Sequence, residues 1–131
     1  MIGLDTNVLV RFLVRDDTRQ FERARRLIQR EASRGEPVMI SLLVLLETEW
    51  VLRSRYALSK EEIADTVSAL LDAAEVRFEA EPVVEQALYL WRDSPADFAD
   101  CLVGAHHRSL GCEATASFDT RATRLPGFVA P

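Results

Sequence analysis

Short apolar segments alternate with amphipathic segments along this chain of 131 residues, and the alternation limits the fold more than any other feature. The segments that predict strands are 1–5, 38–40, 75–79, 114–118 and 128–129. Apolar side chains recur every three or four positions between them and predict helices over 7–14, 16–33, 42–53, 59–73, 82–91 and 94–111. Strands that alternate with helices indicate an α/β domain with a mostly parallel sheet.

Helix boundary signals support this reading. Ser59 and Glu62 have the spacing of a capping box, and Ser41 is a good N-cap for the helix that follows it. Ser94 followed by Pro95 predicts the start of the last long helix, with proline at its first position.

The composition is that of an ordinary globular protein, with 48% hydrophobic and 28% charged residues. It does not shift along the chain, so we expect a single domain over residues 1–131. No apolar run reaches the roughly 18 residues of a membrane span, and Asp5 interrupts the place of a signal-peptide core. Cys101 and Cys112 form no disulfide framework, so we expect reduced thiols and a cytoplasmic location.

Four carboxylates stand in apolar surroundings: Asp5, Glu47, Asp100 and Asp119. An ionised acid in such a setting costs several kcal/mol unless it is paired or bound to a metal. Ligands of open parallel sheets bind outside the carboxyl ends of the strands. Asp5 and Asp119 follow predicted strands, and Glu47 and Asp100 lie in early turns of helices. We therefore expect all four to converge on one divalent cation.

Each acid also has a structural alternative. Asp5 can cap the helix that begins near Asn7, Glu47 can be a solvated edge residue, and Asp119 can begin a turn. Glu49 serves as a control, because Arg53 stands four residues later and a surface ion pair would account for it.

Other residues have supporting positions. Asp97 shares a helix face with Asp100 and Gly104, and we expect Gly104 to leave room beside the carboxylates. Asp97 is equally well placed to complete a capping box with Ser94. The supporting polar residues are Thr6 and Asn7 beside Asp5, and Ser117 on the same side of its strand as Asp119.

The donor type predicts the metal. Carboxylate oxygens without Cys or His suit Mg²⁺ or Mn²⁺ rather than Zn²⁺. His106 and His107 are adjacent on a helix and point about 100° apart, so they cannot share one ion.

Basic residues recur along one predicted helix although the net charge is −5. This arginine stripe consists of Arg15, Arg19, Arg23, Arg26, Arg30 and Arg34. It is either a solvated face with internal pairs such as Glu22–Arg26 or a surface that follows phosphates.

In this order, the acidic segments resemble the PIN-domain family, in particular VapC-type toxins of toxin–antitoxin pairs. The matching segments are Ile2-Gly3-Leu4-Asp5-Thr6-Asn7-Val8-Leu9, 40–52 around Glu47, Ala96-Asp97-Phe98-Ala99-Asp100-Cys101-Leu102-Val103-Gly104-Ala105, and Ala116-Ser117-Phe118-Asp119. The resemblance implies a three-layer α/β/α sandwich with a short, mostly parallel sheet of four to five strands. It also implies Mg²⁺- or Mn²⁺-dependent RNA cleavage by a single nuclease domain.

The resemblance assigns roles and partners. Asp5, Glu47, Asp100 and Asp119 become catalytic, metal-site acids, with Asp97 accessory. An RNA substrate, a small antitoxin protein and a homodimer are the expected partners. One departure stands out: many relatives carry another acid just after the position of Asp119, where Thr120 and Arg121 stand here.

Three other functions fit less well. A phosphatase of the haloacid-dehalogenase kind needs a second acid two residues after Asp5, where Asn7 stands. A receiver-type phosphate acceptor needs a late lysine, and Lys60 is the only lysine. A catalytically silent module that docks an antitoxin or RNA remains open, although all four principal acids are present.

Overall fold

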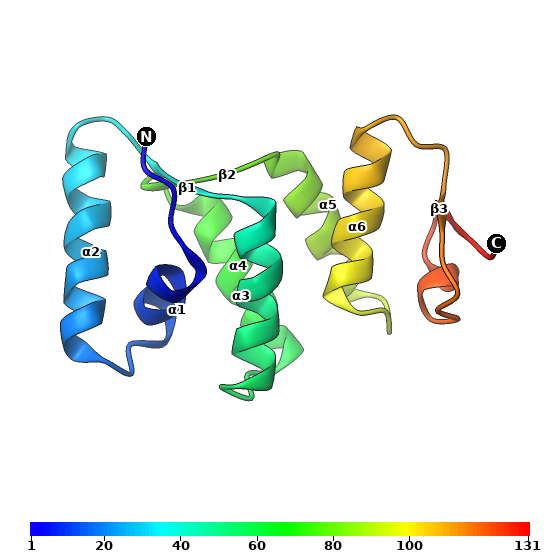
Figure 1. Cartoon of the computed structure of the whole chain (residues 1–131), viewed down its shortest axis with the longest axis horizontal. Helices are drawn as coiled ribbons and strands as arrows, with labels where there is room; N and C mark the ends of the chain where they lie inside the picture. The colour runs from blue at the N-terminus through cyan, green and yellow to red at the C-terminus, as the bar shows by residue number, and fades with distance from the viewer. The chain divides into compact units, whose positions relative to one another are not determined.

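The computed structural model describes residues 1–131. The chain forms two compact units, residues 1–79 and residues 80–131, and each is described by itself (Figure 1). The single domain over residues 1–131 stays a prediction. No helix combines the length and the apolar character that a membrane crossing requires.

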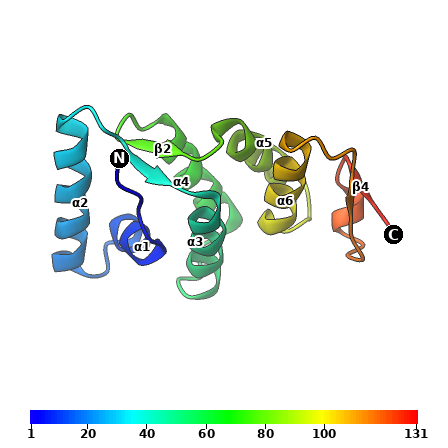
Figure 2. The same cartoon turned by 45° about the horizontal axis from the view of Figure 1, so that its top comes forward.

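Two parallel strands lie in the first unit. β1 (Val38–Ile40) pairs with β2 (Val76–Phe78) in the register Val38–Val76 to Ile40–Phe78 (Figure 2). The N-terminal segment runs beside β1 through one parallel bridge, Gly3–Met39, and the Leu4 amide donates to the Met39 carbonyl at 2.9 Å. The predicted first strand is therefore only a short extended segment paired with β1. Asp5 directly follows this segment.

Four helices complete the first unit: α1 (Thr6–Val14), α2 (Thr18–Ser33), α3 (Leu42–Ser54) and α4 (Lys60–Asp72). Their starts follow the sequence. Ser41 accepts from the Val44 amide at the start of α3, and the capping box of Ser59 and Glu62 is formed at the start of α4. These side chains satisfy backbone amides that have no partner within the helix.

The core of the first unit joins the helices to the strands. α1 packs against α2 and α3, and α4 packs against α3 and β2. The largest fully buried side chains here are Leu9, Val38, Ile40, Leu45, Leu52 and Ile63. Burying each of these side chains contributes about 1.5–3 kcal/mol of free energy. The buried faces of α1 and α3 are therefore held in the core, and their opposite faces are partly exposed to solvent.

The second unit contains α5 (Glu81–Arg92), α6 (Phe98–Ser109), β3 (Thr115–Ala116), the 3₁₀ helix η1 (Ala122–Arg124) and β4 (Phe128–Val129). α5 packs on α6, and the Trp91 and Phe98 rings meet edge to face at 5.0 Å between centroids. β3 and β4 are parallel.

Gly104 has a different purpose from the one predicted. A Cβ atom at this position would overlap the ring of Phe128, so the missing side chain admits the aromatic ring of β4 against α6. The space beside Gly104 is therefore filled by apolar packing and does not remain open for the carboxylates.

The predicted start of the last long helix was wrong. α6 begins at Phe98, with Asp97 as the N-cap residue, and Ser94 lies before it, ahead of a bend at Pro95 and Ala96. The Ser94 hydroxyl accepts from the Ala96 amide at 3.0 Å, a local bond that competes with helix formation. The capping box between Ser94 and Asp97 is consequently not formed, and Asp97 is available for other contacts.

The strand pairing agrees with the α/β prediction only in part. Both strand pairs are parallel, as predicted, but they form two separate two-stranded sheets. The single sheet of four to five strands is not confirmed.

The hydroxyl of Thr48 gives a test of the core. Thr48 is 3% exposed on α3, and its oxygen has no hydrogen-bond partner. Because a buried unpaired hydroxyl costs free energy, Thr48→Val should raise the free energy of unfolding by about 1 kcal/mol. Urea denaturation measures it. Thr66→Val is the matched control, since the exposed Thr66 hydroxyl donates to the Glu62 carbonyl, and an equal gain in both variants would contradict the assignment.

Candidate functional site

Three carboxylates gather in the second unit. Asp97, Asp100 and Asp119 each offer one oxygen atom, and these oxygens lie within 4.8 Å of one another. Asp97 is the N-cap of α6, Asp100 lies in its first turn, and Asp119 follows β3. The positive end of the α6 dipole favours negative charge at Asp97 and Asp100. We call these three residues the acidic cluster.

Asp100 is the member of the acidic cluster whose pKa is shifted. It is half-buried, and burial raises the pKa of its carboxyl group, with further increases from the charges of Asp119 and Asp97. The Arg121 guanidinium lowers this pKa but does not cancel the rise. Burial and the neighbouring negative charges thus disfavour the ionised form of Asp100 in the folded chain.

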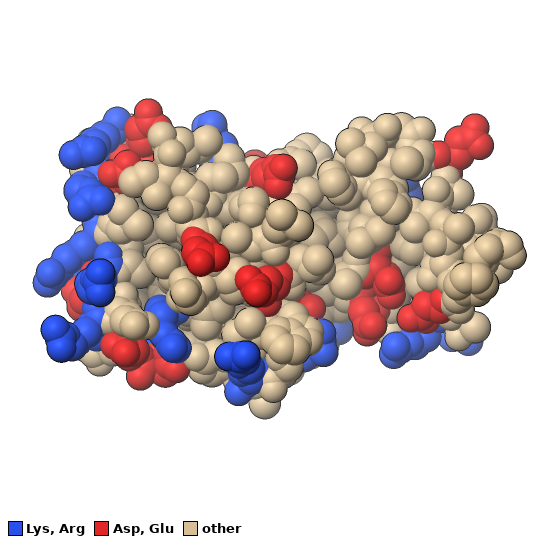
Figure 3. Space-filling view, viewed as in Figure 1, with Lys and Arg blue, Asp and Glu red and all other residues tan.

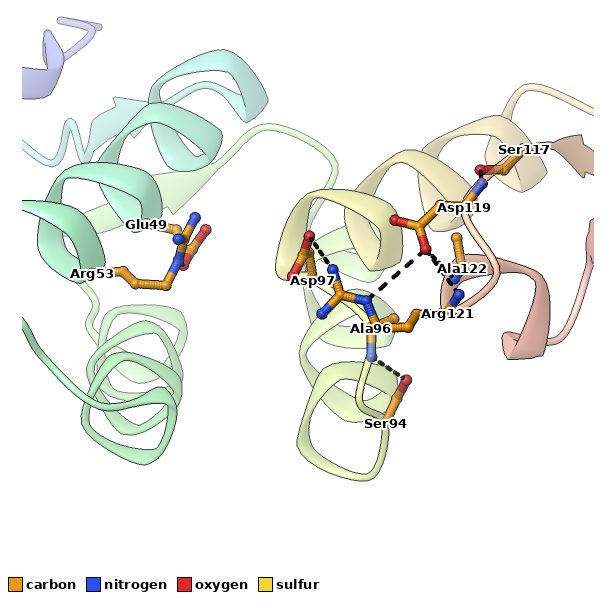
Figure 4. Close-up of polar contacts among 9 residues, drawn as sticks. All are labelled: Glu49, Arg53, Ser94, Ala96, Asp97, Ser117, Asp119, Arg121 and Ala122. Atoms are coloured by element: carbon orange, nitrogen blue, oxygen red, sulfur yellow. Dashed lines mark hydrogen bonds and ion pairs between the residues drawn. The ribbon is translucent and has the colours of Figure 1, made fainter.

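Arg121 is the functional residue that sequence reasoning missed. Its Nη2 atom lies 3.7 Å from Asp97 Oδ2, and its Nε atom lies 4.0 Å from Asp119 Oδ1 (Figure 4). It therefore acts as a built-in counter-ion of the acidic cluster. The available signal was its place in the Thr120-Arg121 pair just after Asp119, where the resemblance leads us to expect an acid.

Asp119 also begins a turn, which is the structural role that its sequence position allowed as an alternative to metal binding. Its Oδ1 atom accepts from the Arg121 amide at 2.8 Å and from the Ala122 amide at 3.4 Å. The Ser117 hydroxyl accepts from the Asp119 amide at 3.0 Å. The bonds from Arg121 and Ala122 use Oδ1 and fix the Asp119 side chain, while Oδ2 accepts from no backbone amide.

Asp5 and Glu47 form a second acidic group in the first unit, joined by Thr6. The Thr6 amide donates to Asp5 Oδ1 at 2.8 Å, and the Thr6 hydroxyl donates to Glu47 Oε1. Thr6 is 7% exposed, whereas both acids are exposed. One buried threonine therefore orients two carboxylates that are far apart in the sequence. Asp5 is also the N-cap of α1, so it has the capping role that the sequence allowed as an alternative.

Glu49, the acid that we compared with Glu47, differs from the prediction in its burial. The predicted ion pair is formed, with Arg53 Nε 2.8 Å from Glu49 Oε2 (Figure 4). Glu49 is only 3% exposed, however, whereas Arg53 is exposed, so the pair joins a buried carboxylate to a guanidinium at the surface. The buried acid of α3 is the one with a cationic partner, and Glu47 faces solvent with Thr6 as its donor.

The donor set of the acidic cluster fits a hard divalent cation. It consists of carboxylates alone, the ligands that Mg²⁺ and Mn²⁺ prefer. The nearest soft donors are engaged elsewhere: Cys101 is fully buried, and His107 Nδ1 contacts the Thr115 hydroxyl at 2.9 Å.

The arginine stripe lies along α2, where basic residues gather on the surface of the first unit (Figure 3). Glu22 pairs closely with Arg25 at 2.8 Å, while the predicted partner Arg26 lies 4.0 Å away. Arg19 and Arg23 are exposed and have no acidic partner. The stripe is thus partly paired and partly free.

Asp100→Asn should stabilise the metal-free protein at neutral pH. The raised pKa means that ionised Asp100 costs folding free energy above that pKa, and the cost disappears as the pH falls to the unfolded value of 3.8. The gain in melting temperature should therefore shrink toward pH 4 and vanish below it.

Two controls sharpen this measurement. Asp93→Asn changes an exposed acid outside the cluster and should leave the melting temperature unchanged. Saturating Mg²⁺ in the neutral-pH melt should stabilise the wild type more than Asp100→Asn. A variant less stable than wild type in EDTA at pH 7 would contradict the predicted cost of the charge.

The chain is similar in sequence to known proteins. The family model described as PIN domain matches residues 2–127. A VapC ribonuclease of Aquifex aeolicus (strain VF5) is 26% identical over 125 residues, which covers 95% of this chain and 91% of the relative. Because the family model spans nearly the whole sequence, the chain belongs to the PIN domain family.

Proposed function

We propose that this protein is a metal-dependent endoribonuclease and the toxin of a toxin–antitoxin pair. The observation that carries the proposal is the acidic cluster, with three carboxylate oxygens within 4.8 Å and a raised pKa at Asp100. The name of the Aquifex relative, a VapC ribonuclease, supports RNA as the substrate.

The acidic cluster would hold Mg²⁺ or Mn²⁺ through Asp97, Asp100 and Asp119. When bound, such a cation offsets charge on a phosphodiester and lowers the pKa of water. Asp97 and Asp119 contribute charge that Arg121 only partly balances, and the turn at Ser117 fixes Asp119.

Asp5 and Glu47 are proposed to serve the same cleavage reaction. Thr6 orients both carboxylates, and Asn7, which is exposed, offers an amide near them. Glu47 can then accept a proton from a water molecule, because Thr6 engages one of its carboxylate oxygens and the other accepts no hydrogen bond.

The remaining expectations belong to this proposal. They are a small cognate antitoxin, a homodimer, a cytoplasmic location and a three-layer α/β/α sandwich with one sheet of four to five strands. The family membership supports them. Light scattering of the purified protein tests the dimer, and mass spectrometry of copurifying small proteins tests the antitoxin.

Cleavage of a structured RNA tests the function directly. The wild type should cleave in Mg²⁺ or Mn²⁺ and stop in EDTA. Asp5→Asn, Glu47→Gln, Asp100→Asn and Asp119→Asn should each lower kcat at least about 100-fold, since each removes charge from the proposed machinery. Asp97→Asn should have a smaller effect.

Matched controls separate chemistry from folding. Glu61→Gln in the first unit and Glu113→Gln in the second change exposed acids outside both groups and should keep full activity. Circular dichroism should show that all variants are folded. Cleavage that survives chelation and the Asp5 and Asp100 substitutions would reject the nuclease. RNA binding without any cleavage would favour the silent binding module.

Thr6 provides a finer test of orientation. Thr6→Val keeps the shape but removes the hydroxyl that donates to Glu47, so kcat should fall about 10- to 100-fold with little change in KM. Thr6→Ser restores the donor and should recover most of the rate. Equal rates for the valine and serine variants would show that the hydroxyl has no such role.

A further inference from the structure

A pocket of about 380 Å³ lies in the first unit beside the exposed face of α3. Its lining includes Asp5, Arg11, Glu47, Trp50, Arg55 and Tyr56. It combines two carboxylates with two guanidinium groups and two aromatic rings, so its formal charges balance. Its volume falls in the usual range of small-ligand pockets. The arginines and aromatic rings have no part in the cleavage proposed above, and the pocket also contains both acids that Thr6 orients.

Trp50 presents an aromatic face to solvent in this pocket. The side chain is 50% exposed, while the other tryptophan, Trp91, is 4% exposed in the second unit. Trp50 follows Glu47 by three positions on α3, so the two share one helix face. An indole left half in water at the wall of a pocket offers a surface on which a flat ring can stack, and stacking is the usual contact between proteins and unpaired bases.

Arg55 supplies an unpaired guanidinium at the C-terminal end of α3. It is exposed at the C-cap of α3 and forms no ion pair. At a rise of 1.5 Å per residue it lies about 12 Å along the helix axis from Glu47. A phosphate at Arg55 is therefore a different one from a phosphate beside Glu47.

Arg11, by contrast, is held in place. Its Nε atom donates to Gln20 at 2.7 Å, and its Nη1 atom donates to the Tyr56 hydroxyl at 2.8 Å and to Asp16 at 3.1 Å. The Tyr56 hydroxyl in turn donates to Asp16 at 2.9 Å. This network makes a fixed polar wall, and it leaves Arg55 as the guanidinium that can move to meet an anion.

We propose that this pocket binds one nucleotide of single-stranded RNA next to the cleaved phosphodiester, with the base stacked on Trp50 and a phosphate paired with Arg55. The proposal rests on the ribonuclease function and assigns its substrate-positioning residues. Stacking tolerates every base, so the pocket should favour an unpaired nucleotide over a paired one without reading its identity.

A basic peptide is the competing occupant, since Asp5 and Glu47 attract cations. Arg55 opposes it: a cation in the pocket would meet a free guanidinium, whereas a nucleotide meets a partner for both its base and its phosphate. The nucleotide satisfies more of the lining groups, and the peptide becomes an outcome of the test.

Tryptophan fluorescence tests the proposal without any cleavage. The probe is an unstructured eight-nucleotide RNA, titrated in EDTA so that metal-dependent cleavage does not proceed. Stacking on Trp50 should quench its emission in a saturable way, while buried Trp91 provides a constant background. Trp50→Phe should abolish the quench but keep most of the affinity, measured with a labelled RNA, because phenylalanine still stacks.

Trp50→Ala and Arg55→Gln should weaken binding of the labelled RNA. Loss of one stacked base predicts a drop in affinity of about 5- to 150-fold for Trp50→Ala. In cleavage assays with metal, this variant should raise KM with little change in kcat. Leu43→Ala and Arg77→Gln are the matched controls, because Leu43 is 80% exposed on the same helix and Arg77 is an exposed arginine on β2, both outside the pocket.

The outcomes separate this proposal from the proposed function. Cleavage with no quench, and with KM unchanged in Trp50→Ala, overturns the nucleotide pocket and leaves the ribonuclease standing. A quench that Trp50→Phe removes, without cleavage by the wild type, keeps the pocket and rejects the ribonuclease. Quenching by an arginine-containing octapeptide but not by the RNA assigns the pocket to a peptide and overturns the proposal.

Discussion

Partial burial of Asp100 beside the charges of Asp119 and Asp97 is the interaction on which the candidate site depends. Burial, and then these two charges, raise the pKa of Asp100, so the three carboxylate oxygens within 4.8 Å of one another carry an electrostatic cost. The turn at Asp119 and the N-terminal end of α6 hold the acids together in spite of it. Arg121 reduces the cost without removing it. This cluster is the basis of the proposed cation site.

The two acidic groups are built by different means. In the second unit, backbone amides and an arginine hold the acids close to one another. In the first unit, one buried threonine orients Asp5 and Glu47 while leaving both carboxylates open to solvent. The second arrangement suits residues that must contact a substrate. Glu47 lines the same pocket as Trp50 and Arg55. Glu47, one of the proposed catalytic acids, therefore shares a face of α3 with Trp50 of the proposed nucleotide pocket.

Much of the fold follows from local rules. The capping box at Ser59, the N-cap at Ser41 and the periodicity of α2 place the helices because each depends on residues a few positions apart. The start of α6 was wrong because a serine–amide bond at Ser94 competed with the helix, and sequence spacing cannot rank the two. The burial of Glu49 and the approach of Arg121 to the acids were also missed. Both depend on tertiary packing rather than on neighbours along the chain.

Calorimetric titration of the metal-free protein with Mn²⁺ tests the central claim most directly. The account predicts saturable binding to the wild type that weakens at least about 10-fold in Asp119→Asn and in Asp100→Asn, and that is unchanged in the Glu113→Gln control. Equal Mn²⁺ binding by the wild type and both aspartate variants would contradict it, because the three carboxylates would then not be the ligands.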